Sequence, residues 1–362
     1  MNSQNATRFR WHFEPRVGWM NDPNGLVYFR GMYHAFFQHY PHAPRWGQMH
    51  WGHAVSEDLV HWQELPIALY PDREYENDGG CFSGSAIEKD GRLYLFYTSV
   101  SHEMKQTQSV AWSDDGIHFT KYSENPVIRE NPLGSEDFRD PKVSLIDGVY
   151  YMVVGSGNMD SGKVLLYKSA DLLHWDYVGI LFEGAEFAHC IECPDFFRMG
   201  DKYVLMFSQI NRRERASWFV VGDFRDGKLI NCRISRPEWG PDFYAPQTFT
   251  DGTRRIMIGW MYHWGKPAPE GCEFAGALSI PRELLLEGET ILNYPVTAAR
   301  HLLKRESPYV RVCGKRLILT DRYGTDRDWV LENLDRVEIL EDTKSVEVFV
   351  NRGENSFSLW LE

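Results

Sequence analysis

Five short apolar segments recur along the chain, and most of them follow a glycine or another turn residue. The segments are 31–37, 92–97, 149–154, 202–207 and 255–260. Their anchor residues are Tyr33, Tyr94, Tyr151, Tyr203 and Ile256. The anchors are spaced by about 50–60 residues, which is the period of a four-stranded propeller blade. The repeat therefore predicts an all-β fold, a five-bladed β-propeller.

A second repeat lies between these segments. Residues 56–62, 113–119 and 169–175 each begin with Ser, carry Asp two positions later and end with His and an aromatic residue. Ser and Asp side chains form turns, so we expect a turn before the next strand. Because the histidines recur at a fixed place, we expect a structural rather than a catalytic role for them. They are His61, His118 and His174.

Counting back eleven residues from each anchor leads to a set of equivalent positions. They are Asp22, Ser83, Asp140, Glu192 and Ala245. In a propeller the innermost strand of each blade borders the central axis, so equivalent positions in successive blades converge. Three of these positions carry carboxylates, and we expect the three to face one another as a candidate active site.

Convergent carboxylates are the groups that cleavage of a glycosidic bond requires. One carboxyl group protonates the leaving oxygen, and a second acts beside the anomeric carbon. Two acids held close together cannot both ionise easily, so their pKa values separate and leave one acid and one base. Arg139, directly before Asp140, is expected either to pair with these acids or to bind the sugar. The residues alone leave the individual roles unassigned.

Three motifs around the carboxylates resemble those of glycoside hydrolase family 32, which comprises invertases, fructanases and sucrose-6-phosphate hydrolases. They are Trp-Met-Asn-Asp-Pro-Asn-Gly at 19–25, Phe-Arg-Asp-Pro at 138–141 and Glu-Cys-Pro at 192–194. Segments 51–56, 81–85 and 258–261 are similar to further motifs of that family. All six occur in the family's order, and the resemblance covers roughly residues 10–296.

The resemblance implies a five-bladed β-propeller, the fold that the repeat predicts independently. It also implies a retaining β-fructofuranosidase that hydrolyses sucrose and short β-fructosides through a covalent fructosyl-enzyme. Asp22 would be the nucleophile, Glu192 the general acid and then the base, and Asp140 the group that stabilises the transition state. Neither a metal nor a cofactor is implied, and the partner would be a small sugar.

The resemblance further assigns residues to a fructose pocket. Those at matching positions are Asn21, Gln38, Trp46, Phe82, Ser83 and Arg139, and we expect Tyr244 and Trp260 to border the same pocket. One departure lies beside the acid, because family members usually carry Trp before the acid/base Glu and this chain carries Ile191. We therefore expect a change in the pocket wall near the leaving group.

A second departure is a shortened C-terminal β-module. Residues 1–296 are expected to form the propeller, and residues 297–362 a β-sandwich-like module that is much shorter than the family's usual one. The module contains an alternating strand at 345–350. So small a unit has little core of its own, and we expect it to pack on the propeller or on another subunit of a homo-oligomer.

Charge and hydropathy exclude several classes of partner. The net charge of -12 argues against nucleic acid, which needs a positive protein surface. No apolar run approaches the roughly 20 residues of a membrane span. Residues 1–7 are polar and lack the apolar core of a secretion signal, so we expect a cytoplasmic protein. Cys190 and Cys193 form a lone C-x-x-C, which does not predict a zinc site.

Four alternatives stay open. A sucrose-6-phosphate hydrolase would need clustered cations near the pocket. Candidate cations are Arg45, Arg73, Lys105 and Lys266. A fructosyltransferase would pass the same intermediate to a sugar. Inverting pentosan hydrolases share the propeller, but the motif at 19–25 favours fructosides. A sugar-binding propeller without catalysis is disfavoured, since all three carboxylates are present.

Overall fold

The computed structural model describes residues 8–210, 215–261, 268 and 271–362. In this part of the chain the regular structure consists of β-strands and short 3-10 helices, with no α-helix. The prediction of an all-β chain is therefore confirmed. None of the described helices is long and apolar enough to cross a membrane. Residues 1–7, on which the expected cytoplasmic location rests, and the candidate phosphate ligand Lys266 lie outside the described residues.

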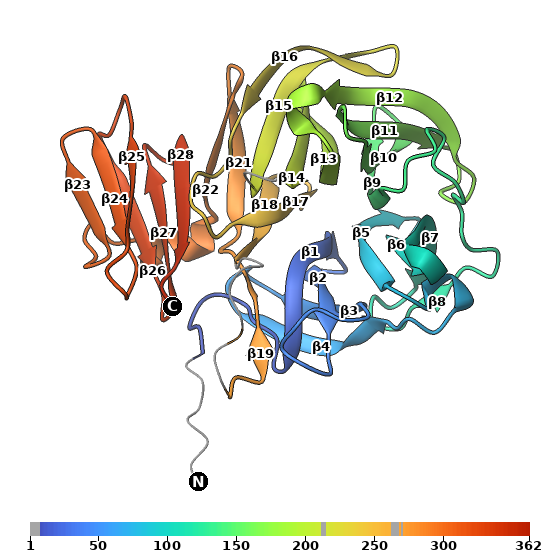
Figure 1. Ribbon diagram of the computed structural model, residues 1–362, viewed down its shortest axis with the longest axis horizontal. Helices are drawn as coiled ribbons and strands as arrows, with labels where there is room; N and C mark the ends of the chain where they lie inside the picture. The colour runs from blue at the N-terminus through green and yellow to red at the C-terminus, as the bar shows by residue number, and fades with distance from the viewer. Residues whose placement is uncertain (1–7, 211–214, 262–267, 269–270) are drawn as a thin grey trace.

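Five sheets follow one another along the chain, and each adds its strands outward in chain order (Figure 1). The first contains β1 (Gly18–Phe29), β2 (Met32–Tyr40), β3 (His50–Ser56) and β4 (Trp62–Leu69), with β19 (Phe274–Ala275) parallel to β1. The second contains β5 (Gly80–Lys89), β6 (Arg92–Ser101), β7 (Lys105–Ser113) and β8 (Thr120–Lys121). The third contains β9 (Phe138–Ile146), β10 (Val149–Gly157), β11 (Gly162–Ser169) and β12 (Asp176–Gly184). The fourth contains β13 (Cys190–Met199), β14 (Lys202–Ile210), β15 (Arg215–Arg225) and β16 (Lys228–Ser235). The fifth contains β17 (Tyr244–Thr250), β18 (Arg255–Met261), β21 (Arg282–Glu287) and β22 (Thr290–Pro295), with β20 (Ala277–Leu278) beside β18.

The C-terminal module, residues 297–362, holds two three-stranded antiparallel sheets. One consists of β23 (Val310–Cys313), β24 (Arg316–Thr320) and β25 (Asp326–Val330), and the other of β26 (Val337–Glu341), β27 (Ser345–Val350) and β28 (Asn355–Trp360). Buried side chains of both sheets, among them Leu317, Val348 and Phe357, form a small common core. The 3-10 helices are η1 (Glu74–Glu76), η2 (His102–Met104), η3 (Ala185–Phe187) and η4 (Thr297–Leu302).

The five innermost strands lie around a common centre in Figure 1. Each contacts the next in the order β1, β5, β9, β13 and β17, and β17 contacts β1. Hydrophobic clusters fill the spaces between neighbouring sheets. One of them joins the fifth sheet to the first, since Phe249 and Ile256 pack with Ala35 and Phe37. Burial of apolar side chains therefore fixes each sheet against its two neighbours.

The five predicted apolar segments coincide with β2, β6, β10, β14 and β18, the second strand of every sheet. These strands pair on both edges, and most of their residues are buried, as in Met32–Tyr40 and Arg92–Ser101. A strand buried on both faces reads as a continuous apolar run rather than an alternating one. This explains why the second strand, and not the innermost one, carries the visible repeat.

The Ser–Asp repeat forms the turn between the third and fourth strands of the first three sheets. In the first sheet, Ser56 Oγ accepts a hydrogen bond from the amide of Leu59 over 2.8 Å. Asp58 accepts one from the amide of His61 over 2.8 Å, and its other oxygen lies 2.7 Å from His61 Nδ1. The second and third sheets repeat these contacts. The three histidines hold exposed turns together, which confirms their structural role.

Every innermost strand contains a β-bulge near its beginning, where two residues stand opposite one residue of the second strand. The bulged pairs are 21–22, 82–83, 140–141, 193–194 and 245–246. A bulge bends its strand and re-aims side chains, and bulges are frequent beside active sites. In three of them the first residue has a positive φ, which is 65° at Asp140, 48° at Cys193 and 48° at Ala245.

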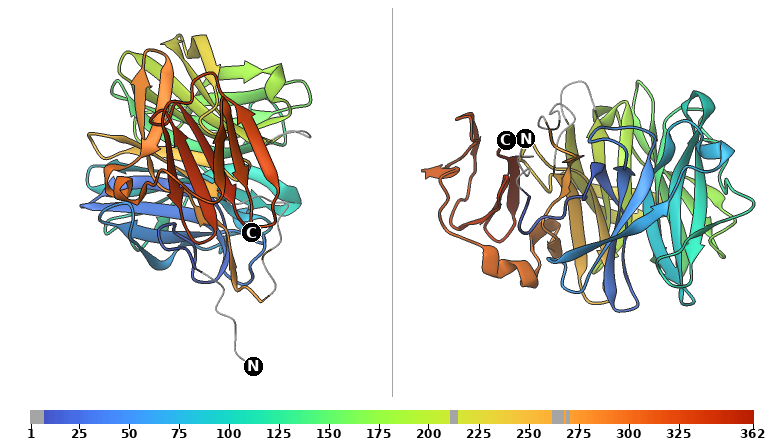
Figure 2. Two further views of the ribbon diagram at one scale, coloured as in Figure 1. Left: turned by 90° about the vertical axis from the view of Figure 1, so that its left-hand side faces the viewer. Right: turned by 90° about the horizontal axis from the view of Figure 1, so that it is seen from below.

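The C-terminal module packs against the fifth sheet, where β28 contacts β22 (Figure 2). Arg282 of β21 lies 2.7 Å from Glu238 and 2.5 Å from Glu347 of β27. His12 lies 2.8 Å from Asp342 and 2.7 Å from Glu347. All five side chains are buried, and we call them the junction cluster. Of the two partners expected for residues 297–362, the propeller or another subunit, the structure shows contacts with the fifth sheet of the same chain.

Candidate active site

Relative to the bulges, the three candidate carboxylates occupy three successive positions along their strands. Glu192 is the last paired residue before the bulge of β13, opposite Ser208. Asp140 is the first residue of the bulge in β9, and Asp22 is the second in β1. The eleven-residue step leads to the right strands but is wrong as a register. The reason is that the anchors lie at different distances from the bulges: the residue opposite the bulge follows the anchor by five positions in the first sheet and by three in the third. In addition, β1 contains another irregularity at 25–26.

Asp22 is held by side chains from its own strand and from β5. Ser83 Oγ donates a hydrogen bond to Asp22 Oδ2 over 2.6 Å. Asn21 also hydrogen-bonds to Asp22, and the indole N–H of Trp19 donates to Asn21 Oδ1 over 2.7 Å. Ser83 and Asp22 are the second bulge residues of adjacent strands, so two of the predicted positions touch directly.

Asp140 is buried and is joined to the other acids through Cys193. The amide of Cys193 donates to Asp140 Oδ2 over 2.8 Å. The thiol of Cys193 lies 3.6 Å from that oxygen and 3.6 Å from Asp22 Oδ2. The amide of Asp140 donates to Thr98 Oγ1 over 2.9 Å, which anchors the bulge to β6. Cys193 thus connects the carboxylates of β1 and β9 to β13.

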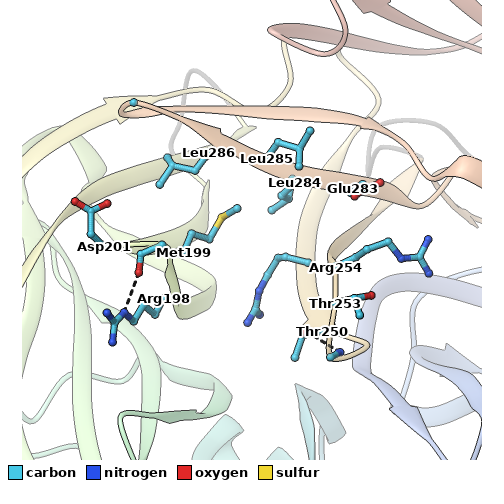
Figure 3. A pocket seen from close by; sticks show the side chains of 14 residues that line it. Arg198, Met199, Asp201, Thr250, Thr253, Arg254, Glu283, Leu284, Leu285 and Leu286 are labelled. Atoms are coloured by element: carbon cyan, nitrogen blue, oxygen red, sulfur yellow. Dashed lines mark hydrogen bonds between the residues drawn. The ribbon is translucent and has the colours of Figure 1, made fainter.

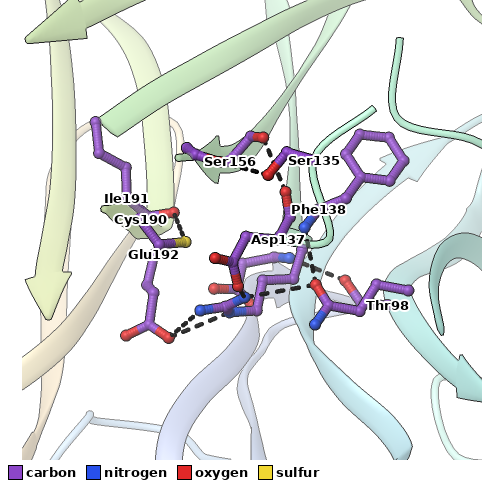
Figure 4. A network of polar contacts seen from close by, with 12 residues as sticks. Thr98, Ser135, Asp137, Phe138, Ser156, Cys190, Ile191 and Glu192 are labelled. Carbon is purple, nitrogen blue, oxygen red and sulfur yellow. Dashed lines mark hydrogen bonds and ion pairs between the residues drawn. The ribbon is translucent and has the colours of Figure 1, made fainter. Parts of the chain in front are cut away.

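Glu192 has a hydrogen-bond donor at each carboxylate oxygen, and Figure 4 shows the contacts at one of the two oxygens. Arg139 donates to Oε1 from Nε over 3.1 Å and from Nη2 over 2.8 Å. The hydroxyl of Tyr244 donates to Oε2 over 2.6 Å. Arg139 is itself held by Asp137 and Gln106. Arg139, Glu192 and Tyr244 are the last paired residues before three adjacent bulges, so one level of the site forms a continuous chain of hydrogen bonds.

Burial and mutual repulsion disturb the acidity of the carboxylates. Burial raises the pKa of Asp140 to about 7, with Glu192 and Asp22 adding to the rise and Arg139 opposing it. Burial also raises the pKa of Asp22, although the hydrogen bond from Ser83 acts against it. In the folded protein Asp22 and Asp140 therefore ionise less readily than free carboxyl groups do.

Two neighbours of the acids keep their protons at neutral pH. Burial raises the pKa of the Cys193 thiol and of the Tyr244 hydroxyl above their usual ranges. A hydroxyl can donate to a carboxylate and accept from a carboxyl group, because its hydrogen rotates. Tyr244 can therefore contact Glu192 in both protonation states. Such a carboxyl group can serve as general acid and base, and a fixed carboxylate beside it can act as a nucleophile.

Other predicted pocket residues lie close to these acids in the fold. Gln38 is buried on β2, and its side-chain amide donates to the carbonyl of Cys81 over 2.8 Å. Phe82 stands next to Ser83, and its ring lies edge-on to that of Trp46 with centroids 6.1 Å apart. Trp46 is 41% exposed. The two rings offer apolar surface of the kind on which sugar rings stack.

Two residues discussed from the sequence are fully buried, and the expected position of Trp260 at the border of the pocket stays a prediction. Trp260 is fully buried, with its ring 5.8 Å from that of Trp19. Ile191 is fully buried between the third and fourth sheets, in a cluster with Val153 and Phe207. The structure contradicts the expected change of the pocket wall, because the side chain at this position packs into the core rather than facing the acids.

Three residues at the site are not among those predicted. They are Cys193, Asp137 and Gln106. The bulge that turns Cys193 between two carboxylates has no signature in residue spacing. Asp137 stands two positions before Arg139, so strand alternation is the signal that could have found it. Gln106 comes from the beginning of β7, and nothing in its sequence context points to the site.

Metal ligation has no evident set of ligands at this centre. The described residues contain no group of three or more His, Cys, Asp or Glu side chains that could hold a metal ion. Cys190 and Cys193, the two thiols of the C-x-x-C, have different surroundings. The thiol of Cys190 donates to the carbonyl of Ile191 over 3.3 Å, whereas that of Cys193 lies between carboxylates.

The described candidates for phosphate binding lie in different environments. Arg45 is exposed, and Arg73 lies 3.6 Å from Asp72. Lys105 lines a cavity of about 600 Å³ that adjoins the site through Asp137. The other charged residues lining this cavity are His102, Glu103, Arg129, Glu130 and Glu136. Acidic groups therefore outnumber cations around Lys105.

A separate pocket of about 560 Å³ opens at the opposite ends of the innermost strands (Figure 3). It is lined by residues of β13 and β21 and by the turn after β17, including Arg198, Leu286 and Thr253. None of the three carboxylates lines it. The acids thus gather at one end of the sheets only.

Comparison with known protein families and sequences gives consistent matches. Residues 12–295 match the model of the Glycosyl hydrolases family 32 N-terminal domain. The chain is 37% identical over 378 residues to sucrose-6-phosphate hydrolase of Escherichia coli, covering 97% of this chain and 78% of that protein. It is 39% identical over 332 residues to raffinose invertase of Escherichia coli, covering 85% of this chain and 69% of that protein.

Solved structures give the same picture. A mutant GH32 beta-fructofuranosidase of Bombyx mori in complex with sucrose has a TM-score of 0.87 and 30% identity. The match covers 98% of this chain and 89% of that chain. Sucrose-6-phosphate hydrolase of Lactobacillus gasseri has a TM-score of 0.85 and 26% identity, with coverage of 99% and 89%.

Proposed function

This chain belongs to glycoside hydrolase family 32, and we propose that it is a retaining β-fructofuranosidase that hydrolyses sucrose and short β-fructosides. The observation that carries the proposal is the meeting of Asp22, Asp140 and Glu192 from the first, third and fourth sheets around Cys193. The names of similar proteins support the substrate class, since one is a raffinose invertase and another was solved with sucrose.

Asp22 is the nucleophile in this proposal. One of its oxygens forms a bond to the anomeric carbon of the fructosyl unit while the bond to the leaving oxygen breaks. Ser83 and Asn21 hold the carboxylate in place, which reduces the entropy that must be lost before attack. Water then attacks the same carbon and releases Asp22, so configuration is retained over two steps.

Glu192 supplies the proton to the leaving oxygen and later takes a proton from the attacking water. Arg139 and Tyr244 hold the carboxyl group at the required place. Tyr244 suits both steps, because its hydroxyl accepts from the acid form and donates to the ionised form.

Asp140 stabilises the transition state by accepting hydrogen bonds from fructose hydroxyls. Its pKa of about 7 means that the proton it carries in the free protein is weakly held near neutral pH. Hydroxyl donors of a bound sugar favour the ionised form, so sugar binding and loss of this proton support each other.

We further infer that the five sheets are the blades of a closed five-bladed β-propeller spanning residues 1–296, with residues 297–362 as a separate module. The contact of β17 with β1 supports closure, as does the shared cluster between the fifth and first sheets.

Sucrose 6-phosphate is the second candidate substrate, because similar proteins carry the name sucrose-6-phosphate hydrolase. We place unphosphorylated sucrose first, since the cavity around Lys105 is mainly acidic and would repel a phosphate.

The test is release of fructose from sucrose by the purified protein, with sucrose 6-phosphate in parallel and Asp22→Asn as the control. We expect wild type to release fructose and Asp22→Asn to lose turnover by a factor on the order of 10⁴ or more. If wild type cuts neither sugar, the proposed function is wrong. If it cuts only the phosphate ester, the second candidate replaces the first.

A further inference from the structure

A layer of buried polar side chains lies directly behind the bulges, and the mechanism above does not use it. We propose that two of its members, Lys142 and Asp195, are positioning residues for the reaction. They hold β9, β13 and β17 at the spacing that the catalytic side chains need. This inference rests on the hydrolysis proposed above, because it concerns the geometry of the same site.

The two residues occupy equivalent places. Lys142, Asp195 and Gln247 are the first paired residues after the bulges of β9, β13 and β17. Lys142 Nζ donates to the carbonyl of Thr248 over 2.5 Å and lies 3.5 Å from Asp195 Oδ2. The same carboxylate oxygen accepts from the amide of Thr248 over 2.6 Å. One ion pair and two hydrogen bonds thus tie three strands together at one level.

Other strands are tied at this depth by neutral groups. Ser85 Oγ donates to the carbonyl of Pro141 over 2.8 Å, joining β5 to β9. The side-chain amide of Gln247 donates to the carbonyl of Gly84 over 2.8 Å, and its oxygen accepts from the amide of Leu26 over 3.1 Å. Among the described residues at this depth, charged groups therefore join the strands β9, β13 and β17, which carry Asp140, Glu192 and Tyr244.

Stability alone does not account for this ion pair. The side chains of Lys142 and Asp195 are only 5% and 1% exposed. Removing two charges from water is so costly that well-packed apolar residues of similar volume usually serve stability as well or better. One oxygen of Asp195 also lacks a hydrogen-bond partner among the described residues, so the pair is not fully compensated. What such a pair can supply instead is a defined geometry.

This geometry affects the reacting groups because Lys142 and Asp195 lie close in sequence to the catalytic acids. Lys142 follows Asp140 by two residues, and Asp195 follows Glu192 by three, with only the bulge between. A sideways shift of β9 against β13 would therefore move both acids. It would also disturb the contacts of Arg139 and Tyr244 with Glu192, which cross the same strands.

The experiment compares Lys142→Met, Asp195→Asn and the double variant with wild type, using sucrose as the substrate. Asp195→Asn keeps an oxygen that can accept from the amide of Thr248, so it serves as the conservative variant. The double variant removes both members of the ion pair together and guards against misfolding of Lys142→Met. Arg282→Met, which breaks a fully buried ion pair of the junction cluster, is the matched control.

We expect the folded double variant to lose kcat by a factor on the order of 100, the scale of a misplacement of about 1 Å at a reacting centre. Its pH–rate profile should shift, because the coupled acids change their separation. Asp195→Asn should retain more activity than Asp195→Ala, and Arg282→Met should keep the kcat of wild type although its Tm falls.

An unchanged kcat and pH profile in the double variant would overturn the proposal, as would an equal loss in Arg282→Met. Both results require a wild-type protein that cuts sucrose. Failure of this inference is thus distinct from failure of the proposed function, which shows in wild type itself.

Discussion

The junction cluster and the catalytic carboxylates are both buried and charged, but their charges are balanced in opposite ways. At the junction, burial alone would lower the pKa of His12, yet hydrogen bonds to Asp342 and Glu347 raise it to about 9. Burial alone would raise the pKa of Glu347, yet Arg282 and His12 lower it to about 2. Only Glu238 deviates, since its burial outweighs the charge of Arg282.

The catalytic acids show the reverse. Burial raises the pKa of both Asp22 and Asp140, and the carboxylates repel one another. Folding therefore favours the charged forms of His12 and Glu347 at the junction and disfavours the charged forms of these two acids. The comparison teaches that buried charges can act in two ways. Opposite charges that pair stabilise the fold, whereas like charges held close together shift the pKa values of reactive groups and lower the stability.

Replacing the proposed acid, Glu192, should strongly lower catalysis. It should not affect the junction cluster. Glu192→Ala should lower kcat on sucrose by a factor on the order of 10³, because the leaving oxygen then lacks a proton donor. A fructosyl fluoride needs no such proton and should be affected far less. Steady-state rates on both substrates check this, and an equal loss on both would contradict the acid role of Glu192.

Breaking the junction should affect stability instead. Arg282→Met leaves Glu238 buried without its cation and leaves Glu347 with His12 as its remaining cation, and we expect the free energy of unfolding to fall by about 3–5 kcal/mol. Denaturant melts measure this. The kcat on sucrose in the folded variant should equal that of wild type. A selective loss of kcat would mean that the two clusters are coupled.

The pH dependence of stability sharpens the comparison further. His12 has a pKa of about 9 in the folded protein against 6.5 unfolded, so its contribution is full below pH 6.5 and is lost as the pH rises through 9. It amounts to at most about 3 kcal/mol, from 1.36 kcal/mol per pKa unit. His12→Gln should flatten this part of the stability curve. A variant curve parallel to that of wild type between pH 6.5 and 9 would refute the assignment.

The smallest effect on stability is expected from Asp140 in the candidate active site, and its sign is opposite to that of the effect of His12. Asp140 keeps its proton up to about pH 7 when folded but loses it near 3.8 when unfolded, so folding is penalised increasingly between these values. Asp140→Asn removes the ionisable group and should stabilise the protein at pH 8 by about 1–2 kcal/mol while activity is lost. Thermal melts at pH 8 and pH 4 test this, since the gain should nearly vanish at pH 4.

Periodic features of the molecule could be predicted from the sequence, because they depend on local burial. The second strands are largely buried on both faces, so they can be recognised as apolar segments from composition alone. Tyr94 and Tyr151 are the anchors of two of them. A fixed step back from such anchors reaches the strands of Asp22, Asp140 and Glu192. It does not reach their register, because the length of strand between the anchor and the bulge differs from sheet to sheet.

Contacts between distant segments could not be predicted. His12 and Asp342 are 330 positions apart in the sequence, and neither lies in a recognisable motif. Lys142 and Asp195 do lie beside family motifs, but pairing between them depends on the mutual placement of two sheets. The side chain of Ile191 likewise differs from expectation because strand alternation, rather than proximity to Glu192, decides which way it faces.

The bulge in each innermost strand also bears on how such a protein can diverge. The backbone sets the place of every bulge residue, whichever side chain it carries. On β5 and β17 the bulged pairs, 82–83 and 245–246, contain no acid. Mutations at Phe82, Ala245 or Pro246 leave the hydrogen bond from Ser83 to Asp22 in place, so they can alter the sugar that is accepted while the three carboxylates stay where they are. Specificity can thus change through some copies of the repeated sheet while the chemistry is kept by others.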